Sequence, residues 1–182
     1  MKMLKAPTTA LPRNPRFNVV ATPDAPFTLD VRWETGRAYV PFVRRHLPRA
    51  HALLRSRLAD LSLALVGDAT MSRLHRQFLK KTGPTDVLTF ELEHDAAGSV
   101  TSGEVVTCVP EAARQARRLG VSVERELLLY ALHGMLHLSG FDDRTASEFR
   151  AMHRMEDDIL TRLGLGATFA VAPRRRADLR GK

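Results

Sequence analysis

The chain has 182 residues and a formal net charge of +8, and no apolar run is long enough to cross a membrane. The length suits a single domain that can bury a hydrophobic core. The first residues lack the apolar stretch of a secretory signal, and the single cysteine, Cys108, cannot form an internal disulfide. These features exclude a membrane-spanning protein and a disulfide-rich secreted protein, and they favour the reducing cytoplasm. Cys108 lies in a predicted strand, where we expect a buried residue rather than a metal ligand.

The excess positive charge lies at the two ends of the chain. Residues 1–16 carry four basic residues and no acidic one, residues 167–182 carry five basic residues and one acidic one, and residues 17–166 carry 19 of each. Both ends contain proline and few large apolar residues. We therefore expect a flexible basic arm over 1–16, a single folded domain over 17–166 and a disordered basic tail over 167–182.

The first half of the predicted domain alternates strands with helices. Phe17–Ala21 is typical of a short strand, and two prolines mark a turn after it. One or two helices are expected between Trp33 and Asp60, with Pro48 at a break or in a first turn.

A buried strand, a helix and a hairpin are expected next. Leu61–Gly67 has the apolar character of a buried strand, and Asp68 is expected to cap a helix that runs to about Leu79. Asp86–Glu93 and Gly103–Val109 alternate in hydrophobicity as strands do, and we expect them to pair as an antiparallel hairpin.

The last third of the domain is predicted to be helical. One helix is expected to begin at Pro110 and end at Gly120, and the amphipathic segment Ser147–Leu163 forms another. Between them, Ser122–Asp143 contains a helix that is apolar nearly all round and should end at Gly140. The element order β-α-β-α-β-β-α-α-α predicts an α/β fold, with a small mixed sheet of about four strands packed against about five or six helices. The helix in Ser122–Asp143 should be buried among them.

This buried helix carries two histidines one turn apart, His133 and His137. Side chains at i and i+4 share one face of a helix, so both imidazoles could bind one cation at about 2.0–2.1 Å, the zinc–nitrogen distance. A glycine turn follows, and Asp142 and Asp143 come directly after it. The alternative is a pair of hydrogen-bonded core histidines, but the turn and the acids favour a metal site. Three protein ligands and one open position are typical of catalytic zinc, although such ligands also suit iron, nickel or manganese.

The spacing of the two histidines also occurs in zinc peptidases. Those enzymes place a glutamate general base directly after the first histidine, where this chain has Gly134. The glycine argues against a peptidase, which we keep as the least favoured alternative.

The segment HGMLHLSGFDD closely resembles the signature of the YbeY family of bacterial endoribonucleases and ribosome maturation factors, usually His-Gly-x-Leu-His-Leu-x-Gly-Tyr-Asp-His. The segment LHRQFLKKTGPTDVLTFELE resembles a second block of the family, and Ser102–Val106 resembles its Gly-Asp-Ile strand. The similarities extend from about Leu74 to Leu163, roughly half of the chain.

The resemblance implies one zinc ion per chain, bound by His133, His137 and Asp143. The family usually has histidine at the third position, so the aspartate is a departure. Asp142 could be the ligand instead, or the third ligand could be lost. A second departure is Leu79, which aligns with an arginine implicated in the family's catalysis.

Other residues could supply the missing catalytic groups. Arg76, Lys80 and Lys81 are close enough in sequence to provide a phosphate-contacting cation, although they could equally be solvated surface residues. Glu104 and Asp86 are candidates for the general base, but strand-edge hydrogen bonding and turn capping are the simpler roles for them.

The function that the resemblance implies is that of a single-strand-acting, metal-dependent endoribonuclease. It would act in ribosomal RNA processing, namely 3′-end maturation of the small-subunit 16S rRNA, and in ribosome assembly or quality control. The expected partners are RNA and the small ribosomal subunit, with no membrane and no small-molecule cofactor. Within the basic tail, Arg174, Arg175 and Arg176 are the candidate RNA contacts, although such tails can also serve solubility alone. The main alternative is an RNA-binding ribosome-assembly protein whose zinc is mainly structural.

Overall fold

A five-stranded mixed sheet forms the centre of the protein. The computed structural model describes residues 4–5 and 26–169. The strand order is β1-β4-β5-β3-β2; β4 and β5 are antiparallel, and the other neighbours are parallel. The predicted hairpin and the predicted mixed sheet are therefore confirmed. The strands are β1 Leu4–Lys5, β2 Thr28–Trp33, β3 Asp60–Val66, β4 Val87–His94 and β5 Val100–Cys108.

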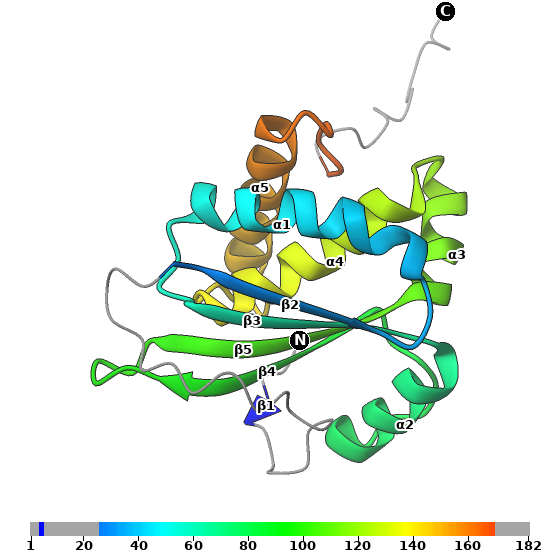
Figure 1. The fold of residues 1–182 in the computed structure, drawn as a ribbon, viewed down its shortest axis with the longest axis horizontal. Coiled ribbons are helices and arrows are strands. Elements are labelled where there is room, and N and C mark those ends of the chain that lie inside the picture. Colours follow the sequence, from blue (N-terminus) through cyan, green and yellow to red (C-terminus); the bar gives the residue numbers. More distant parts are fainter. Residues whose placement is uncertain (1–3, 6–25, 170–182) are drawn as a thin grey trace, which may run out of the picture.

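Helices cover both faces of this sheet, but unequally. Figure 1 shows α1, α3, α4 and α5 on one face and α2 on the other. No helix of the described part of the chain is long and apolar enough to cross a membrane. The helices are the 3-10 helix η1 Arg37–Tyr39, and α1 Val40–Leu54, α2 Asp68–Leu79, α3 Val109–Leu119, α4 Val123–Leu138 and α5 Ala146–Arg162.

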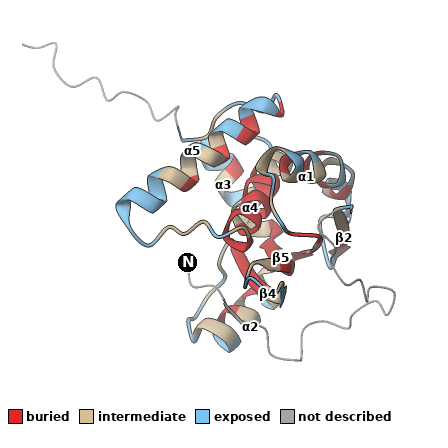
Figure 2. Ribbon diagram, turned by 90° about the vertical axis from the view of Figure 1, so that its left-hand side faces the viewer, coloured by how far each residue is buried: buried red, intermediate tan, exposed pale blue. Residues whose placement is uncertain are grey.

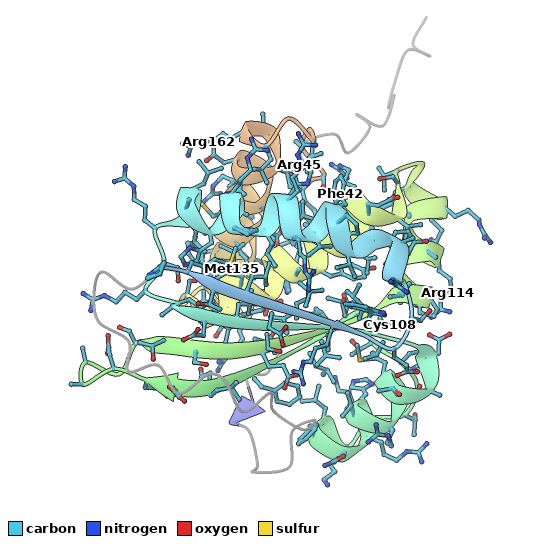
Figure 3. The ribbon with its side chains drawn as sticks, in the orientation of Figure 1. Phe42, Arg45, Cys108, Arg114, Met135 and Arg162 are labelled. Carbon is cyan, nitrogen blue, oxygen red and sulfur yellow. The ribbon has the colours of Figure 1, made fainter. Side chains whose placement is uncertain are left out.

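Helix α4 lies in the middle of the larger hydrophobic core. Twelve of its 16 residues are buried, and Figure 2 shows it enclosed by the sheet and its neighbouring helices. Met135 points into the layer between the helices and the sheet and is fully buried (Figure 3). Each fully buried side chain of this size contributes about 1.5–3 kcal/mol. The predicted α/β fold with a buried histidine helix is confirmed.

The first long strand differs from the prediction. The sheet contains β2 at Thr28–Trp33, whereas the strand predicted at Phe17–Ala21 lies outside the described residues. All six residues of β2 pair in parallel with β3, from Thr28 opposite Asp60 to Trp33 opposite Leu65. A parallel pair needs a long crossover, which α1 provides.

Two helix boundaries also correct the sequence analysis. Pro48 lies inside α1, which continues to Leu54 without a break. An interior proline costs about 3 kcal/mol, but its neighbours Leu47 and Ala50 are fully buried and offset that cost. Asp68 does not cap α2, because Gly67 occupies the N-cap position. The predicted ends of α2 at Leu79 and of α3 before Gly120 agree with the structure.

Candidate metal centre

The two ends of α4 are fixed by local hydrogen bonds. At the start, the Ser122 side chain accepts a hydrogen bond from the first turn, as expected of an N-cap. At the other end, Gly140 has a φ of +91°, the left-handed conformation that favours glycine. The Gly140 N–H donates to the His137 carbonyl and the Phe141 N–H donates to the Leu136 carbonyl, both at 3.0 Å, which is a Schellman motif. The chain therefore reverses directly after the second histidine.

Helix α4 approaches the sheet most closely at Gly134. A Cβ atom at this position would lie 2.7 Å from a methyl carbon of Val105 and 3.0 Å from the Thr89 hydroxyl. A larger side chain would therefore clash, and a glutamate could not occupy the position without moving the helix. The site thus lacks the general base of zinc peptidases for a steric reason, in agreement with the sequence analysis.

The two histidines face each other through their Nε2 atoms, which are 3.2 Å apart. Two ligand atoms bound to zinc at 2.0–2.1 Å in a tetrahedron are separated by about 3.3 Å. The Nδ1 atom of His133 lies 2.7 Å from a Glu156 carboxylate oxygen, and Nδ1 of His137 lies 3.0 Å from the Phe141 carbonyl oxygen. Since both of these partners are acceptors, each Nδ1 carries the proton and each Nε2 is left unprotonated.

This arrangement fits a bound cation better than a shared proton. Two unprotonated nitrogens that face each other repel unless a positive species lies between them. A shared proton would make one imidazole cationic, but burial lowers the pKa of His137, and the neighbouring His133 lowers it further. Neutral imidazole is also the form that binds metals. The donor set and its protonation therefore fit a divalent metal ion.

A third donor lies beside the two imidazoles. One carboxylate oxygen of Asp143 and the ring nitrogens of His133 and His137 all lie within 4.8 Å of one another. The other candidate, Asp142, accepts a hydrogen bond from the Asp143 N–H and forms an ion pair with Arg144. The geometry therefore favours Asp143 as the third ligand, and its ligand role remains a prediction.

A buried carboxylate that the sequence analysis missed supports this site. Glu156 on α5 is fully buried, and its two oxygens contact Nδ1 of His133 and Nδ1 of His153 at 2.7 and 2.5 Å. Carboxylates in this position fix the tautomer of a metal-binding histidine and raise its basicity. A sequence signal existed, because Glu156 is a charged residue at a core position of the amphipathic helix, four residues after the buried Met152.

The candidate cations lie near the C-terminal end of α2, on the opposite face of the sheet. Arg76, Lys80 and Lys81 are exposed, and Lys80 donates to the Gln77 carbonyl. Leu79, where the resemblance predicts an arginine, packs against the small apolar cluster between α2 and the sheet. No contact with the histidines is recorded for any of them within the described residues, so their catalytic role remains a prediction.

The two candidate general bases have structural partners. Gly103 and Val105 of β5 face α4, so Glu104 between them points to the opposite face of the sheet. There it pairs with Arg32 of β2 at 2.5 Å. Asp86 accepts hydrogen bonds from the Val87 N–H and the Thr85 hydroxyl, which is turn capping. Asp86 has the turn-capping role considered for it. Glu104 lies on the inner strand β5 and forms an ion pair with Arg32, which differs from the strand-edge hydrogen bonding considered for it.

The cysteine contacts a carboxylate and not the histidines. Burial raises the pKa of Cys108 to about 12, and its thiol contacts Asp68 at 3.3 Å. Cys108 and Arg114 lie at one end of the sheet, near the start of α2 (Figure 3). In the tail, residues 167–169 are described, whereas the predicted RNA contacts Arg174, Arg175 and Arg176, and most of the arm over 1–16, lie outside the described residues.

Comparison with known proteins identifies the family. The profile described as "Endoribonuclease YbeY" matches residues 38–164. A protein named Endoribonuclease YbeY from Thermobifida fusca is 38% identical over 145 residues, which cover 73% of this chain and 92% of the relative. One of the same name from Beutenbergia cavernae is 42% identical over 109 residues, covering 56% and 73%.

A solved structure supports the fold independently. The solution structure of TM1509 from Thermotoga maritima superposes with a TM-score of 0.53 at 23% sequence identity, covering 85% of this chain and 100% of that chain. At this identity the likeness concerns the fold alone. The family profile spans well over half of the chain and includes the two histidines and the acid that follows them. The chain therefore belongs to the YbeY endoribonuclease family.

Proposed function

We propose that this protein is a zinc-dependent endoribonuclease that hydrolyses phosphodiester bonds of single-stranded RNA. The observation that carries the proposal is the cluster of His133, His137 and Asp143, with the two Nε2 atoms 3.2 Å apart, in a chain of this family. The donor set leaves room for a water molecule and a substrate oxygen, as catalytic sites require. We infer one metal ion per chain, with zinc favoured by the two imidazoles.

A divalent cation bound there would polarise a phosphoryl oxygen and make a water molecule more acidic. The protein's own part is orientation. Glu156 and the Phe141 carbonyl each bind the Nδ1–H of one histidine, so both rings present a lone pair to the same point. Asp143 replaces a neutral ligand by an anion and thereby reduces the net positive charge that faces the phosphate. We expect it to weaken the attraction of the site for RNA.

In the cell we expect the substrate to be ribosomal RNA of the small subunit, with maturation of the 3′ end of the 16S rRNA as the candidate reaction. The expected compartment is the cytoplasm. The excess of basic residues at both ends of the sequence supports a nucleic-acid substrate, because such charges bind phosphates irrespective of sequence. No membrane and no organic cofactor enter this proposal.

A second candidate function is an RNA-binding assembly factor whose metal is mainly structural. The observation in its favour is Leu79, an apolar side chain at the position where the resemblance places a catalytic arginine. Under this alternative the metal stabilises the fold, RNA binds, and no phosphodiester bond is cleaved.

One experiment separates the two functions. We would measure metal content, cleavage of an unstructured RNA and cleavage of casein. The three proteins compared are the parent protein, His133→Ala and His137→Ala. The expected result is about one zinc per parent chain, and loss of both metal and cleavage in the two variants. His94→Ala is the control, since His94 is a surface residue paired with Glu91. Bound metal with no cleavage of RNA would establish the assembly-factor alternative, and cleavage of casein would establish a peptidase.

The same assay tests whether another basic residue replaces the arginine that the resemblance predicts at Leu79. Single alanine variants of Arg76, Lys80 and Lys81 should retain the metal, because none of the three belongs to the donor cluster. If one of them supplies the phosphate-contacting cation, its removal should lower cleavage about tenfold or more at unchanged metal content. Cleavage within twofold of the parent for all three variants would assign them to the solvated surface.

A further inference from the structure

A pocket of about 500 Å³ lies next to the candidate metal centre. It is formed by the start of β4, by α3, α4 and α5, and by the segment that follows α5. His133 and Glu156 belong to its wall, so the pocket and the metal centre share a side chain. Its volume falls within the range of about 300–1,000 Å³ that is typical of ligand pockets. A substrate group in this pocket would therefore lie close to the reacting bond.

The wall of the pocket is acidic. Asp86, Glu111, Glu126 and Glu156 line it, and its lining includes no lysine or arginine among the described residues. Glu111 is paired with Arg114, which lies outside the lining, and Glu156 contacts two imidazoles. Asp86 and Glu126 remain as acidic groups that disfavour a phosphate in the pocket. Carboxylates instead accept hydrogen bonds from N–H groups, which the bases of RNA present on their edges. The pocket therefore suits the base of a nucleotide and not its phosphate.

Aromatic side chains provide a second feature of a base-binding pocket. Phe169 lines the pocket, is 38% exposed and stacks on His153, with ring centroids 3.7 Å apart. Its position is fixed by the backbone, since the Phe169 N–H donates to Asp157. Unpaired bases stack on aromatic rings of this kind.

The segment that carries Phe169 is anchored to the start of α4. The Arg125 guanidinium donates to the carbonyl oxygens of residues 165, 166 and 167 and to the Thr168 hydroxyl, all between 2.9 and 3.0 Å. The segment that carries the aromatic ring is therefore held in place at the pocket by these hydrogen bonds.

A carboxylate in the pocket wall has an unsatisfied oxygen. Glu126 is 3% exposed, and within the described residues its Oε2 atom has no hydrogen-bond partner. Burial raises the pKa of Glu126, although a hydrogen bond from Tyr130 opposes this. A buried acceptor without a partner is unfavourable. This oxygen is closed to solvent, so a donor would reach it only if the Glu126 carboxyl group turned toward the pocket, and the new hydrogen bond would then remove the penalty.

We propose that this pocket holds one unpaired nucleobase beside the bond that is cleaved, and that it prefers guanine. The inference rests on the proposed ribonuclease function and names the feature of the RNA that the site recognises. Guanine presents N1–H and N2–H donors side by side, whereas uracil has a single N–H between two carbonyl oxygens that carboxylates repel. A base-paired nucleotide has this edge occupied, so only single-stranded RNA can enter.

The test is a binding measurement that does not depend on cleavage. The probes are fluorescent 2′-O-methyl oligouridylates with a single G, A, C or U at the centre, and anisotropy is read with the zinc-loaded full chain. The strand can slide until the central base meets the pocket. We expect the G probe to bind at least fivefold more tightly than the U probe, and Glu126→Gln to reduce this preference to less than twofold.

Two phenylalanine variants test whether the aromatic side chain in the pocket wall binds the base. Phe169→Ala should weaken binding of the G probe about tenfold. Phe149 packs edge-on against the same His153 but does not line the pocket, so Phe149→Ala should change affinity less than twofold. Equal affinity for the four probes would overturn the proposal, as would equal losses in the two phenylalanine variants.

Failure of this inference is distinguishable from failure of the proposed function. Cleavage of a mixed-sequence RNA is measured in parallel on the same preparations. Cleavage without any base preference in binding rejects the guanine pocket and leaves the ribonuclease intact. A preference for the G probe without cleavage retains the pocket and rejects the nuclease. Circular dichroism of each variant checks that it is folded.

Discussion

The two faces of the sheet differ in how firmly they hold their candidate functional side chains. On the α4 face, His133 and His137 are each fixed by a second hydrogen bond, to Glu156 and to the Phe141 carbonyl. On the α2 face, the basic residues near the end of the helix are exposed. Groups that must converge on one ion need rigid partners, and a charge that only attracts phosphate does not.

The departures from the family pattern follow the same division. On the α4 face, the resemblance predicts a histidine where this chain has Asp143. The aspartate offers a carboxylate oxygen in place of a ring nitrogen, so the cluster still contains three donors. On the α2 face, Leu79 replaces a charged residue with an apolar one that joins a hydrophobic cluster. The comparison shows three donors that could hold a metal ion on the α4 face, and an apolar side chain packed into a hydrophobic cluster at Leu79 on the α2 face.

Metal binding should stabilise the folded protein by the largest amount. Zinc that binds the native state at 1,000 times its dissociation constant adds about 4 kcal/mol to the free energy of unfolding. Thermal unfolding with zinc and after chelation should show the corresponding rise in Tm. His137→Ala is the control, because it removes one of the three donors. An equal rise in this variant would mean that zinc stabilises the protein from another site.

Glu156→Gln should have the next largest effect. Glutamine has the shape of glutamate but cannot accept hydrogen bonds from both His133 and His153 as a carboxylate does. We expect metal affinity to fall about 10–100-fold, measured by competition with a chromophoric chelator. Asp158→Asn on the exposed side of the same helix should leave the affinity unchanged. The same affinity in both variants would show that Glu156 is only a packing residue.

Gly134→Ala tests the close contact between α4 and the sheet. The new Cβ would lie 2.7–2.8 Å from the methyl carbons of Val105, which is fully buried. Overpacking costs about 1–3 kcal/mol, while alanine in place of glycine favours a helix by about 1 kcal/mol. We therefore expect a net loss of about 0–2 kcal/mol in the free energy of unfolding, measured by chemical denaturation. In a double-mutant cycle, Val105→Ala should recover part of this loss, and strict additivity would contradict the steric explanation.

The smallest effect is expected on the α2 face, from Asp68→Asn. Hydrogen bonds from Arg114 hold the pKa of Asp68 below its usual value. The pair is largely exposed, so its contribution at neutral pH is about 0.2–1 kcal/mol and weakens with salt.

The sign of the pH dependence follows from this lowered pKa. The contribution of Asp68 is complete above its unfolded pKa of about 3.9 and is lost as pH falls through the lower folded value. The difference in stability between parent and Asp68→Asn should therefore vanish in strong acid. Urea unfolding at pH 7 and pH 2 measures it, and a difference that persists at pH 2 would assign the effect to packing.

Features with a local cause could be predicted from the sequence, and others could not. Periodicity located α4 and the β4–β5 hairpin, and the i, i+4 rule placed His133 and His137 on one face. The strand at Thr28–Trp33 was missed although its polar and apolar residues alternate, because the stretch between the proline turn and Trp33 was left without an assignment. Glu156 was missed because its partner His133 is 23 residues away and on another helix. The wall of the pocket is formed by five separate segments of the chain, which no single stretch of sequence reveals.

The Schellman turn after α4 has a consequence for the timing of metal uptake. The carbonyl of Phe141 that orients His137 belongs to the same reversal that ends the helix. The helix ends and the His137 ring is oriented in the same folding event. The conformational entropy of this side chain is therefore lost during folding and not when an ion binds. Incoming metal should meet a receptor that is already shaped, and its association should need no slow rearrangement of the chain.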